Sequence, residues 1–332
     1  MKKFFSVFLR IAISIVLLVL LFFQVDRKSL FETIRTANKG FLFLAFSIFA
    51  LNYIFCILRW EMLLKAVKIH LSMRRVIISY AGGLFFNLFL PSAIGGDFVR
   101  SIDLATHTKR PREVIATVLL DRLSGYTGLV LLALLAVLFG WKLVQIKSVL
   151  IAIAAITGIL VCILLVLFNS FFYRLVNRML HSPKAGKVRE SIKNLHNEIH
   201  FFKHHKKVIV NNLIFSVIIQ AVVPLSFYVT ALAFGLKTNL LYFFIFIPVI
   251  GAITLLPISI GGLGLRDAST VFFFAQVGIS KDFAFAMSLM NFFFLIVFGA
   301  LGGLIYVLTI RHRRIQHYQP PQVHPAHYHP GY

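Results

Sequence analysis

The chain of 332 residues is too apolar for a water-soluble domain: 59% of its residues are hydrophobic, only 14% are charged, and the mean hydropathy is +0.88. This composition predicts an all-α polytopic membrane protein. A net charge of +23 would suit nucleic acid, but the Lys and Arg residues lie between the apolar runs, as is typical of charges that face an anionic leaflet. We therefore expect no nucleic-acid partner.

Six apolar runs are long enough to cross about 30 Å of hydrocarbon at about 1.5 Å per residue. They lie at 4–25, 41–58, 114–140, 148–168, 208–234 and 283–310. The first run follows Met1-Lys2-Lys3 but has no small-residue cleavage site, so we expect a retained span and not a removable signal. Residues 191–205 alternate apolar with basic residues at near-helical spacing, which is typical of an interfacial amphipathic helix. The tail at 311–332 is polar, Pro-rich and His-rich; we expect a disordered cytoplasmic segment without a metal site.

Two further apolar segments carry the same eleven-residue phrase. Its skeleton, L-P-x-x-I-G-G-x-x-x-R, occurs at 90–100 and again at 256–266. A broken membrane helix of this kind is tolerated where the backbone is buried in protein or lines a cavity. The run at 76–90 is also short for a crossing, which favours re-entrant helical hairpins. The residues expected to break the two helices are Pro91, Gly95, Gly96, Pro257, Gly261, Gly262 and Gly264.

The distribution of positive charge predicts the topology. If the N-terminus is cytoplasmic and each hairpin returns to the side it entered, most of the 34 Lys and Arg residues, including those of a basic loop at 59–75, face the cytoplasm, as the positive-inside rule requires. The order span, span, hairpin, span then occurs twice with opposite orientation, at about 1–142 and 143–310. In such an inverted-topology repeat the two hairpin tips can meet near the midplane and form one site.

Charged residues inside the apolar segments are candidates for that site. Arg100 and Arg266 end the two phrases, and Asp121-Arg122 lies within the third span, where one Arg costs roughly 2.5–3.5 kcal/mol. Adjacent helical residues diverge by about 100°, so we expect Asp121 to pair with a hairpin Arg, leaving Arg122 or the other hairpin Arg for a ligand. Because the second phrase has only Asp267 nearby, Arg266 is the stronger candidate.

The glycine pairs support an anionic ligand. A half-helix begins after each pair, and its free N–H groups favour an anion such as phosphate; Asp97 is placed to cap the first half-helix. An alternative role for the Arg and Asp residues is to lock the hairpins together by ion pairs. The candidate substrate-binding residues are Arg100, Arg266, Arg122, Asp121, Asp97, Asp267 and Asn87.

Three motifs together resemble the lysylphosphatidylglycerol synthase transmembrane family, the flippase-like domain of bacterial multiple peptide resistance factors. They are Asn87-x-x-Leu90-Pro91-x-x-x-Gly95-Gly96-Asp97-x-x-Arg100, Asp121-Arg122-x-x-Gly125 and Leu256-Pro257-x-x-x-Gly261-Gly262-x-Gly264-x-Arg266-Asp267. The resemblance covers residues 1–310 and implies one multi-pass domain of the bacterial plasma membrane that moves a lipid between leaflets. Relatives that synthesise the lipid carry a further soluble domain, so synthase activity is not implied here. Many relatives have Arg where the last span has Asn291.

We therefore expect a lipid translocator that binds a membrane lipid with an anionic or phosphate headgroup, and no cofactor. The sequence has no ATPase phosphate-binding loop, so transport would be passive or ion-coupled. The alternatives are a transporter of a soluble anion, or a membrane enzyme or accessory subunit that acts on lipid-phosphate or polyprenyl-linked substrates in envelope synthesis. An enzyme would need a nucleophile or paired carboxylates, and the apolar segments offer single Asp residues beside Arg. Oligomeric state stays open.

Overall fold

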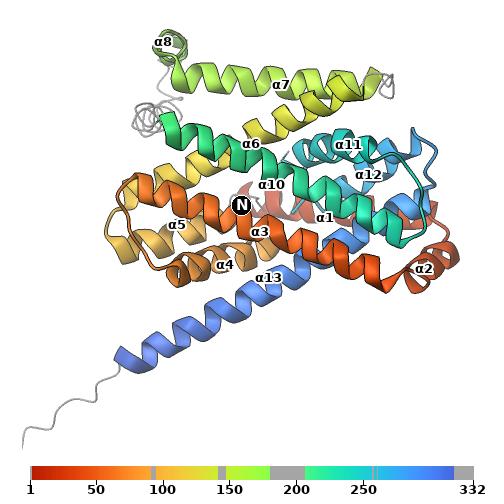
Figure 1. Ribbon diagram of the computed structural model, residues 1–332, viewed down its shortest axis with the longest axis horizontal. Helices are drawn as coiled ribbons and strands as arrows, with labels where there is room; N and C mark the ends of the chain where they lie inside the picture. Colours follow the sequence, from red (N-terminus) through yellow and green to blue (C-terminus); the bar gives the residue numbers. More distant parts are fainter. Residues whose placement is uncertain are drawn as a thin grey trace, which may run out of the picture.

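A computed structural model describes residues 2–90, 95–140, 147–179, 206–255, 258–259 and 261–317. Within these ranges the chain is helical and contains no strand (Figure 1), as expected of an all-α protein. Four predictions lie outside the described residues: the breaks at Pro91 and Pro257, the amphipathic helix at 191–205, and disorder at 318–332.

The predicted spans correspond to six helices: α1 (Lys2–Gln24), α3 (Lys39–Ala66), α6 (Pro111–Phe139), α7 (Lys147–Phe168), α10 (Lys206–Ala233) and α13 (Lys281–His317). The last five are each long and apolar enough to cross a membrane. The first is a sixth candidate when it is joined to α2 (Arg27–Arg35), from which it is bent by 90°. The protein is therefore a multi-pass helical membrane protein. Helix α13 continues to His317 and thus includes the first residues of the predicted tail.

Polar caps define where several of these helices begin. The Asp26 carboxylate accepts a hydrogen bond from the N–H of Lys28 and starts α2, while the Asn38 side chain accepts from two N–H groups and starts α3. Caps of this kind satisfy N–H groups that have no partner within the helix. A contact with another helix also stabilises the bend between α1 and α2, because the N–H of Asp26 donates to Asp282 at the start of α13.

Four shorter helices carry the repeated phrase: α4 (Met73–Phe89), α5 (Gly95–Thr108), α11 (Leu240–Ile253) and α12 (Leu265–Ala275). Helices α4 and α5 pack antiparallel, since the Ser79 hydroxyl donates to the carbonyl of Arg100 and the backbones meet at Gly83 and Gly96. A Cβ at Gly96 would lie 2.1 Å from the carbonyl oxygen of Gly83, so this close approach requires glycine.

The second phrase turns through glycines with positive φ. Gly261, Gly262 and Gly264 have φ values of 57°, 77° and 76°, a region that glycine adopts without the steric strain of a side chain. The N–H of Gly264 donates to the Asp267 carboxylate, which caps α12. These glycines therefore give the backbone directly before α12 a conformation that other residues rarely adopt.

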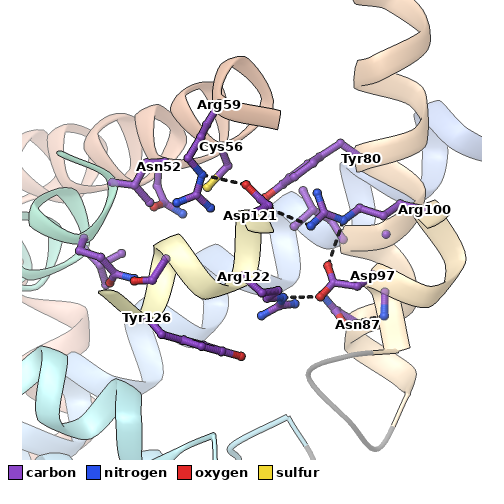
Figure 2. Close-up of a pocket in the computed structure, with 17 residues that line it drawn as sticks. Asn52, Cys56, Arg59, Tyr80, Asn87, Asp97, Arg100, Asp121, Arg122 and Tyr126 are labelled. Carbon is purple, nitrogen blue, oxygen red and sulfur yellow. Dashed lines mark hydrogen bonds and ion pairs between the residues drawn. The ribbon is translucent and has the colours of Figure 1, made fainter. Parts of the chain in front are cut away.

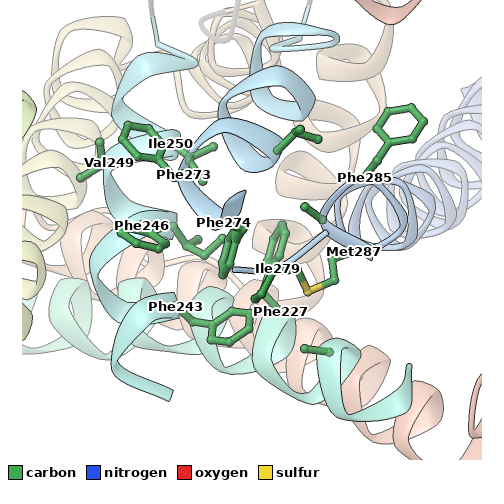
Figure 3. Packing of buried hydrophobic residues seen from close by; sticks show 14 of the residues in the cluster. Phe227, Phe243, Phe246, Val249, Ile250, Phe273, Phe274, Ile279, Phe285 and Met287 are labelled. Carbon is green, nitrogen blue, oxygen red and sulfur yellow. The ribbon is translucent and has the colours of Figure 1, made fainter. Parts of the chain in front are cut away.

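The largest apolar core joins α10, α11, α12 and α13. Phe243, Phe246 and Phe274 are fully buried in it, and the Phe274 ring contacts the other two, tilted against Phe243 and edge-on to Phe246 (Figure 3). Helix α10 also packs along α3 and α6, and α13 packs along α4. In contrast, α7 lies on the outside of the bundle (Figure 1), where it contacts α6, α11 and the following helix α8 (Ser170–Met179).

Candidate functional site

A polar cavity of about 270 Å³ lies between α3, α4, α5, α6 and α10 (Figure 2). Charged side chains from three of these helices line it: from the N-terminal turns of α5 and from within the long helices α3 and α6. The charged residues of this cavity are Arg59, Asp97, Arg100, Asp121 and Arg122.

Asp121 neutralises two arginines at once. Its Oδ2 accepts from Nη2 of Arg100 at 2.8 Å, and its Oδ1 accepts from Nε of Arg59 at 2.8 Å (Figure 2). All three side chains are at least nine-tenths buried. The pairing of Asp121 with a hairpin arginine, predicted from the sequence, is thus confirmed, and α3, α5 and α6 are tied together by one carboxylate.

Asp97 joins the remaining arginine to the same network. Its Oδ1 accepts from Nε of Arg100 at 2.9 Å, and its Oδ2 pairs with Nε of Arg122. The sequence suggested that Asp97 caps α5, but the carboxylate instead points toward the two guanidinium groups (Figure 2). Asn87 supplies the cap: its Oδ1 accepts from the N–H of Gly96 at 2.8 Å. One N–H group at the N-terminus of α5 therefore already has a partner on α4.

Arg100 is the most enclosed cation of the cavity. It is 3% exposed, and its guanidinium carbon lies 4.6 Å from the centroid of the Trp60 ring and 5.2 Å from that of Tyr80, distances at which a cation is attracted to an aromatic face. Its Nη1 has no hydrogen-bond partner among the described residues. Buried polar groups are nearly always hydrogen-bonded, so this N–H group marks a place for an external acceptor.

The charges of the cavity do not balance. Three arginines and two aspartates line it, so the ion pairs leave an excess of one positive charge. In a medium of low dielectric such an excess favours one anionic ligand. The same ion pairs are also consistent with the alternative role, in which the Arg and Asp residues lock the helices together, because they join α3, α5 and α6.

Arg266 and Asp267 form a second ionic cluster. Nη2 of Arg266 donates to Oδ1 of Asp267 at 2.8 Å and its Nε donates to the Ser288 hydroxyl at 3.1 Å, while its guanidinium carbon lies 4.8 Å from the Phe292 ring. The carboxylate folds back to cap Gly264, which brings it within reach of the adjacent arginine. Arg266 thus has Asp267 as its one carboxylate partner among the described residues, as the sequence suggested, whereas Arg100 pairs with both Asp97 and Asp121.

The two phrases do not share the cavity. Among the described residues, those that line it come from 52–126 and 219–223, and none comes from 258–267. The physical reason is packing: α5 lies against α4 and α6, whereas α12 lies against α1, α11 and α13. The described residues that line the cavity therefore do not include both copies of the phrase, as the prediction of one shared site required.

Arg59 was not predicted as a site residue. The apolar run ends at Leu58, so the sequence placed Arg59 in a basic loop, yet α3 continues to Ala66 and holds Arg59 in the cavity, where Nη1 also donates to the Ser216 hydroxyl at 2.8 Å. Arg75 was placed in the same loop and is likewise buried, paired with Asp103 at 2.8 Å. The apolar residues that resume at Trp60 and Leu63 were the signal that the helix continues.

Asn291, in the last span, packs against α10. It is 4% exposed, and its Oδ1 accepts from the Ser226 hydroxyl while its Nδ2 donates to the carbonyl of Met287. Its neutral side chain is therefore satisfied by α10 and α13 without an ionic partner.

The fold and this site define a multi-pass helical membrane protein with a buried ionic cavity. Residues 7–303 match the family described as "Lysylphosphatidylglycerol synthase TM region". The chain belongs to this family, as its three motifs predicted.

Curated relatives extend over nearly the whole chain. A UPF0104 membrane protein of Pyrococcus horikoshii is 24% identical over 94% of this chain and 98% of its own length. A UPF0104 membrane protein of Methanothermobacter thermautotrophicus is 24% identical over 85% of this chain and 88% of its own length. No solved structure matches.

Proposed function

We propose that this protein is a lipid translocator that moves a membrane lipid between leaflets by binding its anionic, phosphate-bearing headgroup in the polar cavity. The observation that carries this proposal is Arg100: a buried guanidinium with an unused N–H group, in a cavity with an excess of one positive charge. A guanidinium presents its N–H groups in a plane that matches phosphate oxygens. We assign no enzymatic activity to the cavity.

The depth of the cavity supports a membrane lipid as the source of the phosphate. Arg59 and Asp121 lie within α3 and α6, two candidate spans, so a ligand that reaches them is already inside the hydrocarbon layer. A headgroup can reach that depth while its chains stay in the surrounding lipid. Free inorganic phosphate would have to leave water completely.

We infer that α4 with α5, and α11 with α12, are two re-entrant hairpins of an inverted repeat. These helices have 17, 14, 14 and 11 residues, which at about 1.5 Å per residue is less than about 30 Å of hydrocarbon. In this arrangement the first hairpin enters from the cytoplasm, where both termini lie, and the second from outside the plasma membrane. Movement of the hairpins against the long spans would expose the cavity to each side in turn.

The test is mass spectrometry of lipid that co-purifies with the protein, followed by leaflet exchange in vesicles. We expect wild-type protein to retain anionic phospholipid and to exchange it, and Arg100→Gln to lose both. Arg75→Gln is the matched control, because Arg75 is also buried and paired but does not line the cavity. Normal exchange by Arg100→Gln would refute the proposal. Chemical conversion of the lipid without exchange would point to an enzyme.

A further inference from the structure

An apolar groove of about 540 Å³ runs beside the polar cavity, between α5, α6 and α7. This volume falls in the range of roughly 300–1,000 Å³ that is usual for sites of small organic ligands. Most of its wall is aliphatic or aromatic. Side chains that line it include Phe98 on α5, Ile115 and Leu119 on α6, and Ile163 and Leu167 on α7.

The groove and the polar cavity share one wall. Asp97, Arg122 and Tyr126 line both. The Arg122 side chain is 30% exposed, whereas those of Arg100 and Arg59 are 4% and 6% exposed, so Arg122 stands at the boundary between the two spaces. Figure 2 shows its guanidinium beside Asp97, with the Tyr126 ring on the same side of α6.

We propose that this groove holds a hydrocarbon chain of the same lipid whose headgroup occupies the polar cavity, an inference that rests on the proposed function and deepens it. The substrate class is then a lipid in which an anionic headgroup is joined to at least one long chain. The lipid would pass from one space to the other beside Asp97, Arg122 and Tyr126, with its headgroup in the cavity and its chain in the groove.

Two properties of the groove favour a tethered chain over any other occupant. Its rims are open, because Phe98, Ile115 and Ile163 are 65%, 45% and 44% exposed, so a chain can enter sideways without leaving an apolar medium. In addition, apolar contact alone gives little affinity inside a bilayer, where lipid tails are as apolar as the groove. A chain is therefore selected here only if its headgroup is anchored in the adjoining cavity.

The test uses full-length protein in phosphatidylcholine nanodiscs that contain a trace of phosphatidylglycerol with a diazirine in mid-chain. After illumination, we expect peptides covering 98–123 and 160–167 to carry most of the label. Ile163→Trp should lower this labelling severalfold, because indole fills the groove. Val161→Trp is the matched control: Val161 lies on the same helix and is 45% exposed but does not line the groove.

Three outcomes decide between the possibilities. Label spread evenly over all lipid-facing helices, or equal labelling of Ile163→Trp and Val161→Trp, would refute a bound chain in the groove. It would show that the probe reacts from bulk lipid only. Equal labelling by a diazirine phosphatidylcholine would overturn the link to an anionic headgroup. A leaflet-exchange assay on the same wild-type protein separates the two proposals: exchange without groove labelling refutes the groove alone, and groove labelling without exchange refutes translocation alone.

Discussion

Arg100 and Asp121 form a buried ion pair between α5 and α6, with Nη2 of the arginine 2.8 Å from Oδ2 of the aspartate. The other carboxylate oxygen binds Arg59 on α3 at 2.8 Å. One aspartate thus holds three helices and compensates two cations in a place with little water. The free energy of unfolding should depend strongly on this carboxylate.

Asp121→Asn should lower the free energy of unfolding by about 3–5 kcal/mol, because it leaves buried cations without a counter-charge. The measurement is denaturant unfolding in detergent. Glu113→Gln is the matched control: it removes one partner of the Arg110 pair, whose side chains are 40% and 37% exposed, and exposed pairs contribute about 1 kcal/mol or less. Equal losses in the two variants would show that Asp121 does not hold the cations in the folded protein.

The ionic network shows what the sequence could and could not predict. Apolar runs located the helices, and the cost of a charge in hydrocarbon was enough to predict that Asp121 pairs with one of the two hairpin arginines; the structure shows that it is Arg100. Composition could not predict that Arg59 belongs to this network, since a charged residue at the end of an apolar run is equally typical of a loop. Its partner lies 62 residues away in the chain, and only the packing of α3 on α6 joins them.

The sequence placed Asp267 next to Arg266 but did not predict that their side chains form an ion pair. Adjacent residues on a regular helix diverge, which argued against such contacts, but Asp267 lies in the first turn of α12 and folds back onto the N–H of Gly264. The glycines that precede it, with positive φ, produce this local geometry. Hydrophobic periodicity carries no information about such a turn.

Asn87→Ala should lower stability by about 1 kcal/mol through loss of the cap on Gly96. It should also weaken retention of anionic lipid, because the N-terminus of α5 lines the cavity. Asn38→Ala is the control, since Asn38 caps α3 through Gly40 and Phe41 far from the cavity. The two variants should lose similar stability in unfolding experiments, while co-purified lipid falls only in the first. Unchanged lipid in Asn87→Ala would contradict a role for this cap in the site.

Gly96→Ala should separate α4 from α5 and lower stability by about 1–3 kcal/mol, the usual effect of overpacking. The new Cβ would meet the Gly83 carbonyl oxygen, a backbone atom that cannot rotate away. Gly158→Ala in α7 is the control, because nothing lies within 4 Å of the added Cβ, and its melting temperature should stay the same or rise slightly. A stable Gly96→Ala protein with unchanged lipid retention would contradict the close contact of the hairpin.

Arg266→Gln tests whether the two phrases serve separate sites. It should lower stability by about 3–5 kcal/mol, since Asp267 is fully buried and would lose its counter-charge. It should nevertheless retain anionic lipid in the first cavity, as measured by mass spectrometry of the folded fraction. If Arg266→Gln loses lipid as completely as Arg100→Gln, the two copies act on one ligand.

Cys56 offers a direct measure of the charge in the cavity. Its side chain lines the cavity beside Arg59 (Figure 2), whereas Cys162 lies on α7 and faces outward. In a Cys162→Ser protein, an anionic methanethiosulfonate reagent should modify Cys56 faster than a cationic reagent of similar size, because the excess positive charge attracts it. The difference should shrink when Arg100→Gln is added, and a soluble glycerophosphate should slow the anionic reagent. The Cys56→Ser protein gives the background from Cys162. Equal rates for the two reagents would contradict an anion-attracting cavity.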